Sequence, residues 1–152
     1  MKAALLIALL ASGCIQNEND TGPSVTMTLS TDNGGATSDD SDPQLDLEGM
    51  PELAVTLEVD TQAGQNDVDD SVYPVTQFTG SLSIPMTSFT EADFTSDDNQ
   101  DGPIFTGNDP VMVPASAAGK TIAVTLSAQD ARGFSAYPIS FNVKIVDTGT
   151  GN

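Results

Sequence analysis

The strongest constraint on the fold is an alternation of apolar and polar residues with a period of two. It is clearest in residues 24–30, 53–59, 78–84, 122–128 and 139–145, where apolar residues take nearly every second position and mostly Thr, Ser or other small or polar residues lie between them. Successive side chains of a β-strand point to opposite faces, so the pattern predicts strands with one buried and one exposed face. No segment keeps the 3.6-residue period of an amphipathic helix.

Weaker segments complete this prediction. Residues 45–47 have the pattern of a short edge strand inside a long acidic loop that runs from residue 31 to 52. Residues 111–113 lie between Pro110 and Pro114, which allows an edge strand or no strand. Thr90 is a good N-cap for a single helical turn over residues 90–93.

These segments predict an all-β fold, an antiparallel β-sandwich over residues 24–147, followed by a short tail at 148–152. The last two strands, 122–128 and 139–145, are joined by a short Gly-containing turn and should form a hairpin or neighbouring strands.

The amino terminus has the pattern of an export signal. Met1-Lys2 supplies one positive charge, and residues 3–11 are apolar but too few to cross a bilayer as a helix, which takes about 20 residues. Ala11-Ser12-Gly13-Cys14 is similar to the lipobox of bacterial lipoproteins, although the leucine that the family prefers at the first of these positions is Ala11 here.

The lipobox resemblance implies that residues 1–13 are a cleaved signal peptide and that Cys14 carries diacylglycerol and an acyl chain such as palmitate. Residues 14–23 would then be a lipidated cysteine with a flexible tether. Cys14 is the only cysteine, which excludes a disulfide within the chain. Ile15 replaces the aspartate that retains such proteins in the inner membrane, so we expect a membrane anchor in the cell envelope, at the outer membrane or cell surface. The alternative is an ordinary cleavage site.

The carboxyl-terminal strands resemble the end of bacterial immunoglobulin-like or cadherin-like domains. Residues 124–130 form a strand that ends in Asp, a Gly-containing turn follows, and residues 141–147 form a final strand that ends in Val146-Asp147. The resemblance covers about thirty residues and implies an immunoglobulin-like sandwich.

The charge of the chain limits its partners. It has 22 acidic and 4 basic residues, a formal net charge of −18. Nucleic acids and anionic lipid surfaces bind positive surfaces, so neither is expected as a partner. Divalent cations, basic partners and a saline habitat are all compatible with the composition.

One acidic segment has the spacing of a calcium loop. Residues 97–102 fit D-x-[DN]-x-[DN]-G, the opening of an EF-hand loop, in which alternate oxygens converge on the ion. The twelfth position holds Asn108 instead of an acid, and Asp109 follows one place later. The candidate ligands of Ca²⁺ are therefore Asp97, Asn99, Asp101 and Asp109. The alternative is an acidic turn, since Asp, Asn and Gly are common turn residues.

Other acidic groups are weaker candidates, and we expect them to be solvated loops. They are residues 67–70, residues 39–42, and the pair Asp130 and Asp147, which we expect to lie at one shared end of the sandwich.

Catalysis is not expected. The chain has no His, which excludes Ser-His-Asp and Cys-His mechanisms, and no Trp to line a glycosidase cleft. The glycine at the start of the phosphate-binding loop is missing ahead of Gly119-Lys120-Thr121.

We therefore expect a membrane-anchored lipoprotein that presents a small acidic β-sandwich as a binding or adhesion module, stabilised by calcium in one version of the hypothesis. Its partner would be a protein or a glycan. The alternative is an accessory structural lipoprotein of a cell-envelope complex.

Overall fold

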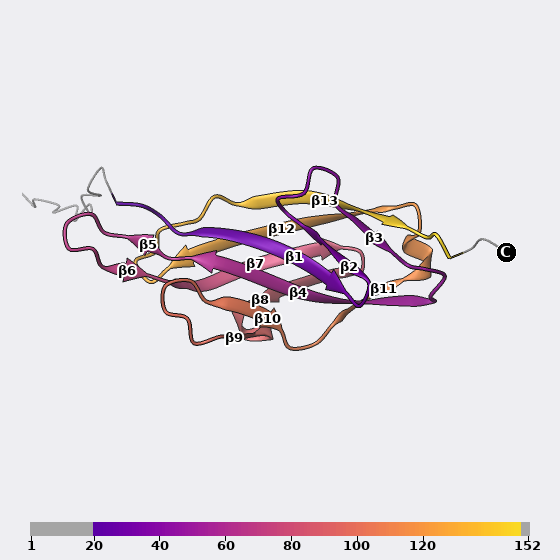
Figure 1. Ribbon diagram of the computed structural model, residues 1–152, viewed down its shortest axis with the longest axis horizontal. Helices are drawn as coiled ribbons and strands as arrows, with labels where there is room; N and C mark the ends of the chain where they lie inside the picture. Colours follow the sequence, from indigo (N-terminus) through magenta and orange to yellow (C-terminus); the bar gives the residue numbers. More distant parts are fainter. Residues whose placement is uncertain (1–19, 150–152) are drawn as a thin grey trace, which may run out of the picture.

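The computed structural model of the chain describes residues 20–149, so Cys14 and the expected signal peptide lie outside the described residues. Two β-sheets pack face to face in an elongated sandwich (Figure 1). The first sheet has the order β2-β1-β4-β10-β9, and β11 pairs with the part of β4 that β10 leaves free. The second sheet has the order β3-β13-β12-β7-β8. The predicted all-β sandwich is confirmed.

The strand bounds follow the chain. The first sheet consists of β1 (Ser24–Thr31), β2 (Gly34–Thr37), β4 (Glu52–Gln62), β9 (Phe94–Ser96), β10 (Ile104–Gly107) and β11 (Val111–Pro114). The second consists of β3 (Gln44–Asp46), β7 (Val75–Ser83), β8 (Met86–Thr90), β12 (Thr121–Asp130) and β13 (Ile139–Val146). A small ribbon, β5 (Gly64–Gln65) with β6 (Val72–Tyr73), and two 3-10 helices, η1 (Glu91–Asp93) and η2 (Ala115–Ala117), complete the fold.

The long strands follow the alternation in the sequence. On β12 every second side chain from Ile122 to Asp130 is buried and those between are exposed. β12 pairs with β13 in an antiparallel hairpin, Val124 opposite Phe141, as predicted. One pairing among the described strands is parallel: β3 lies along β13, with Leu45 opposite Ile145. Thr90 begins the short helix η1 in a capping box with Asp93, which matches the expected helical turn.

The inward side chains form one core between the sheets. Its aromatic part gathers at the β8–β10 side, where Phe78 contacts Phe94 and Phe105 edge to face, with ring centroids 5.0 Å apart in each pair. Phe89 packs on Phe94 at 5.6 Å. Edge-to-face packing adds roughly 0.5–1.5 kcal/mol per pair beyond the burial of area. Four of the six Phe residues thus stabilise one side of the sandwich.

Several elements differ from the prediction. β2, β5, β6, β8, β9 and β10 were not expected, and β4 extends through Gln62 into what the sequence assigned to a loop. β11 is a strand despite its flanking prolines, because it pairs only with β4 at the edge of the sheet. Within residues 20–149, no helix is long and apolar enough to span a membrane.

The two ends of the described chain lie at opposite ends of the long axis (Figure 1). Residues 20–23, which the sequence assigned to the tether, are already held: Thr21 pairs with Gln65, and Pro23 is buried. Asp130 ends β12 at the end of the sandwich where the described chain begins, which we call the amino-terminal end. Asp147 follows β13 at the other end of the sandwich. The expectation that these two acids share one end was therefore wrong.

Candidate functional site

The most connected polar cluster of the described residues surrounds Arg132, in the turn after β12. Its guanidinium donates two hydrogen bonds to Oδ2 of Asp130, from Nε at 3.0 Å and from Nη2 at 2.7 Å. Oδ1 of Asp130 accepts the backbone N–H groups of Arg132 at 2.8 Å and Phe134 at 3.0 Å. Because the Asp130 side chain is 0% exposed, these four bonds supply what water would otherwise give the carboxylate.

The same guanidinium reaches the first described residues. Nη2 donates to the carbonyl oxygen of Thr21 at 3.0 Å, and Nη1 lies 3.8 Å from the Asp20 carboxylate. Its Cζ atom lies over two aromatic rings, 4.3 Å from the centroid of Tyr73 and 4.2 Å from that of Phe134. Contact with aromatic faces suits the flat, weakly hydrated guanidinium.

Gly64 leaves the space that this arrangement needs. A Cβ at Gly64 would collide with Nη2 of Arg132 and would lie 2.7 Å from the Thr21 carbonyl oxygen and 2.9 Å from Oδ2 of Asp130. We call Asp20, Thr21, Gly64, Tyr73, Asp130, Arg132 and Phe134 the Arg132 clip. It joins the start of the described chain, the β5–β6 ribbon and the β12–β13 turn. The polar groups of the clip are hydrogen-bonded to one another, so the clip has a structural role.

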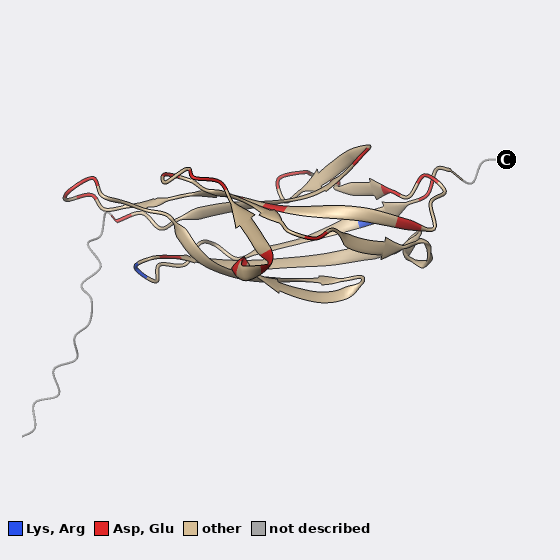
Figure 2. Cartoon of the chain, turned by 90° about the horizontal axis from the view of Figure 1, so that it is seen from below, with Lys and Arg blue, Asp and Glu red and all other residues tan. Residues whose placement is uncertain are grey.

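Acidic residues lie in many of the loops, including those at both ends of the sandwich, and basic residues are few (Figure 2). Of the three basic residues in the described part, Arg132 is in the clip and Lys144 pairs with Asp42. The hydrogen bond from Lys144 holds the pKa of the Asp42 carboxyl below its ordinary value. The surface thus attracts cations over most of its loops.

The expected calcium ligands are only partly brought together. Asp97, Asn99 and Asp101 lie in the turn between β9 and β10, where the side chains of Asp97 and Asn99 cap the turn itself. Oδ1 of Asp97 accepts the N–H groups of Asn99 at 3.3 Å and Ile104 at 3.0 Å, and Oδ1 of Asn99 accepts that of Asp101 at 3.2 Å.

Asp109 is not part of this group. β9 and β10 pair along their length, with Phe105 opposite Ser96 and Gly107 opposite Phe94, so Asp109 follows the far end of the ribbon. A strand rises about 3.3 Å per residue, so the length of β10 separates Asp109 from the turn that holds Asp97. This separation is far greater than the roughly 2.3–2.6 Å at which oxygen ligands coordinate calcium. Among the described residues, no group of three or more acids is placed to hold a metal ion.

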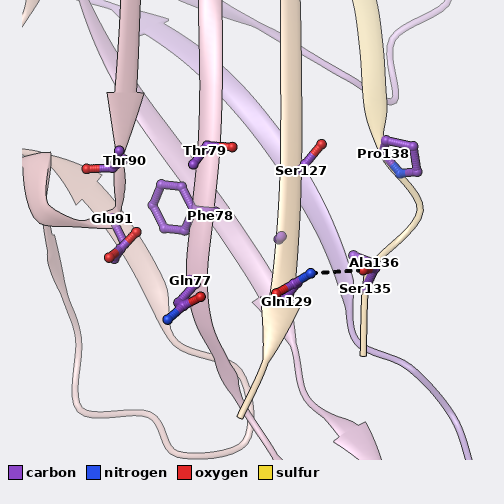
Figure 3. A pocket seen from close by; sticks show the side chains of 11 residues that line it. Gln77, Phe78, Thr79, Thr90, Glu91, Ser127, Gln129, Ser135, Ala136 and Pro138 are labelled. Carbon is purple, nitrogen blue, oxygen red and sulfur yellow. Dashed lines mark hydrogen bonds between the residues drawn. The ribbon is translucent and has the colours of Figure 1, made fainter. Parts of the chain in front are cut away.

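A hollow of about 680 Å³ lies over β7 and β12 at the amino-terminal end (Figure 3). Its lining combines apolar surface with hydroxyl and amide groups, and Gln129 is hydrogen-bonded to Ser135 at its edge. Its lining residues are Gln77, Phe78, Thr79, Thr90, Glu91, Ser127, Ala128, Gln129, Ser135, Ala136 and Pro138. Glu91 is the single charged side chain of this lining.

Compared with models of protein families, with curated proteins and with solved structures, the chain matches none. The functional argument therefore rests on its own residues. Sequence reasoning missed the Arg132 clip, although Arg132 is one of very few cations in the chain and lies two residues after Asp130. It also missed the hollow, because the residues that line it come from four separate segments.

Proposed function

We propose that this chain is a lipid-anchored binding module of the cell envelope, held at Cys14 and presenting an acidic β-sandwich to a partner. The observation that carries the proposal is the placement of the two chain ends at opposite ends of the long axis (Figure 1). A chain anchored just before Asp20 would hold the sandwich by one end and project the other away from the membrane.

The Arg132 clip supports this role because it fixes the chain where a tether would enter. The six residue steps from Cys14 to Asp20 cover at most about 20 Å when extended. A tether that short would keep the amino-terminal end of the sandwich near the bilayer, whereas the sides and the far end would stay accessible.

We further propose that the sandwich is immunoglobulin-like. In that fold strands A, B, E and D form one sheet and G, F and C the other, with C′ beside C in variable-type domains. The order β1-β4-β10-β9 corresponds to A-B-E-D, and β13-β12-β7-β8 corresponds to G-F-C-C′. An NMR structure would test this through the contacts between β9 and β10 and between β8 and β7.

The alternative is a permanent structural subunit of an envelope complex. Such a role calls for a broad apolar outer face. The exposed positions of β7 and β12 carry Thr, Ser and Gln for the most part, which supports reversible binding. A single stoichiometric partner recovered from solubilised membranes would favour the structural role instead.

Calcium belongs to the proposal as a ligand of the β9–β10 turn, with Asp97, Asn99 and Asp101 as its side-chain ligands and without Asp109. In its favour, the three lie on one tight turn, and no hydrogen bond within the described residues occupies the carboxylate of Asp101.

The anchor is tested by expressing the full chain with its signal in a bacterial host. We expect the protein in the membrane fraction, released by detergent but not by high salt, with a lipid mass on the peptide that begins at Cys14. Cys14→Ser should lack that mass, and Ser12→Ala, which keeps a small residue before the cysteine, should retain it. A soluble protein or an unmodified Cys14 would refute the anchor.

A further inference from the structure

The open side of the sandwich between β8 and β11 has the features of a docking groove. β8 is the edge of the second sheet and pairs only with β7 among the described strands. Opposite it, the chain from Gly107 to Met112 passes from β10 to β11 at the edge of the first sheet. Between them lies a groove of about 420 Å³, within the range of ligand-binding clefts.

The backbone of β8 has unused hydrogen-bonding groups along this groove. Thr90 donates its N–H to Oδ2 of Asp93 at 2.8 Å and not to β7. In an antiparallel pair, successive residues direct their N–H and C=O groups alternately toward and away from the neighbouring strand. Ser88 and Met86 therefore also direct theirs outward, and the N–H groups of these two residues find no partner in the part of the chain that the structure describes.

The edge lacks the usual protection against strand pairing. Exposed edge strands normally carry Lys or other charges, a bulge or a proline within the strand. Residues 86–90, Met-Thr-Ser-Phe-Thr, carry no charge in a chain with 22 acids, and they pair with β7 in regular register. Met86 is 93% exposed at the start of this edge.

The groove offers apolar contacts for every second side chain of an added strand. Phe89 and Phe94 form its inner wall, and Pro110, Val111 and Met112 its outer wall. Met112 is 42% exposed, so part of this apolar wall faces solvent. A strand added to β8 would alternate between side chains directed into the groove and side chains directed to solvent.

The charge around the groove selects the occupant. Asp93 and Asp109 line it and no basic residue does. Within residues 20–149 the carboxylate of Asp109 has no hydrogen bond, and the ion pairs are made by Asp20, Asp42 and Asp130. A second copy of this chain would bring a net charge of −18 to an acidic rim, which opposes association. An extended segment with alternating apolar and basic residues is complementary in both backbone and charge.

We propose that β8 and the adjoining groove bind an extended, basic segment of a partner protein by β-strand addition, with its lysines or arginines beside Asp93 and Asp109. Main-chain hydrogen bonds supply affinity in this mode, and the groove supplies specificity. This groove would be the contact surface of the proposed binding module, so the proposal rests on that function.

The test uses the full-length protein in detergent and a fluorescent synthetic peptide of about nine residues, in which valines alternate with lysine and threonine. A second peptide has glutamate in place of lysine. We expect the lysine peptide to bind at least about tenfold more tightly, measured by fluorescence anisotropy, and to slow hydrogen exchange at Met86 and Ser88. Equal binding of the two peptides, or protection elsewhere, would overturn the proposal.

Ser88→Pro removes one outward N–H and no bond to β7, a position at which edge strands tolerate proline. Ser88→Pro should lower the affinity for the lysine peptide at least about tenfold. Ser88→Ala, which keeps the N–H, should change this affinity less than about twofold. Because Ser88→Pro could unfold β8, Asp109→Lys on the opposite wall provides an independent variant. We expect it to lower the affinity for the lysine peptide about fivefold or more.

Unchanged affinity in both variants would refute the site. Concentration-dependent dimerisation that Ser88→Pro abolishes would also overturn the proposal, because the occupant would then be a second copy of the chain. Membrane anchoring is measured separately at Cys14, so a protein that is lipidated but binds neither peptide would contradict the groove alone.

Discussion

The ring of Phe89 on β8 occupies the space above Gly80, the residue opposite it on β7. A Cβ at Gly80 would collide with the edge of this ring and would lie 2.6 Å from the carbonyl oxygen of Thr125 on the other neighbouring strand. The ring thus takes the place of a side chain at position 80 and holds the edge strand to the sheet.

We therefore expect Gly80→Ala to lower the free energy of unfolding by about 1–3 kcal/mol, the usual effect of overpacking a core. Urea denaturation followed by circular dichroism would measure it. Gly22→Ala is the control, because its Cβ would meet only the Ser135 carbonyl oxygen at 3.4 Å. In a Phe89→Leu background the loss should be smaller, and an equal loss there would contradict the role of the ring.

The Arg132 clip makes a second prediction. Arg132→Met leaves the buried Asp130 carboxylate without its cation and should lower the free energy of unfolding by about 3–5 kcal/mol. The stability of Arg132→Lys should fall between this variant and the wild type, because an ammonium keeps the charge but has no planar group to place over the rings of Tyr73 and Phe134. Urea denaturation measures both, and hydrogen exchange at Thr21 and Gln65 should accelerate.

Lys144→Met is the matched control for the clip. Lys144 pairs with Asp42, but the two side chains are 57% and 55% exposed. The loss of such an exposed pair should cost less than about 1 kcal/mol. If Lys144→Met and Arg132→Met are equally stable, the clip does not fix the amino-terminal end of the sandwich.

The long strands could be predicted because burial of one face leaves a period of two in the sequence. β12 is an example, with alternate burial over its whole length. The short strands β8, β9 and β10 carry too few inward residues for a pattern: in β8 only Phe89 is fully buried. Their pairing depends on neighbours that tertiary structure supplies. The parallel contact of β3 with β13 joins residues about 100 positions apart and leaves no local sign.

The candidate sites were less accessible to sequence reasoning for the same reason. The partners of Arg132 include Thr21 and Gly64, which are distant along the chain, so no spacing motif links them. At the calcium motif the spacing was misleading. The turn after Asp97 closes a β-hairpin, and β10 then carries the chain away, so Asp109 cannot approach Asp97 as it would in a continuous EF-hand loop.

Calcium binding by the β9–β10 turn has its own prediction. Excess Ca²⁺ should raise the midpoint of thermal unfolding of the full-length protein above that in EDTA. A ligand held a hundredfold above its Kd stabilises by about 2.7 kcal/mol, a shift of several degrees. Asp101→Asn should abolish the rise, and Asp109→Asn should leave it intact. Asp97 is less suitable, because its carboxylate also closes the turn. Coincident curves in calcium and EDTA would remove calcium from the proposal.

The last prediction concerns acid and the carboxyl-terminal end. Asp46 accepts hydrogen bonds from the hydroxyl and the N–H of Thr148 and from the N–H of Glu48, which hold the pKa of its carboxyl below the ordinary value of 3.8. A carboxyl with a lowered pKa in the folded state stabilises that state above the unfolded value and loses this contribution as the pH falls through the folded value. We therefore expect the attachment of Thr148 to β3 to be intact at neutral pH and to weaken below about pH 3.8.

The difference in unfolding free energy between the wild type and Asp46→Asn isolates this contribution from the other acids. It should be constant from pH 7 to about pH 5 and should shrink below pH 3.8, together with the protection of the Thr148 amide from hydrogen exchange. Asp39→Asn serves as the control, because the side chain of Asp39 makes no hydrogen bond within the described residues. Its difference in unfolding free energy from the wild type should therefore not change in parallel with the protection of the Thr148 amide. A difference for Asp46→Asn that stays the same down to pH 3 would mean that the ionised carboxylate does not hold Thr148, and that the backbone pairing of β3 with β13 alone keeps this end closed.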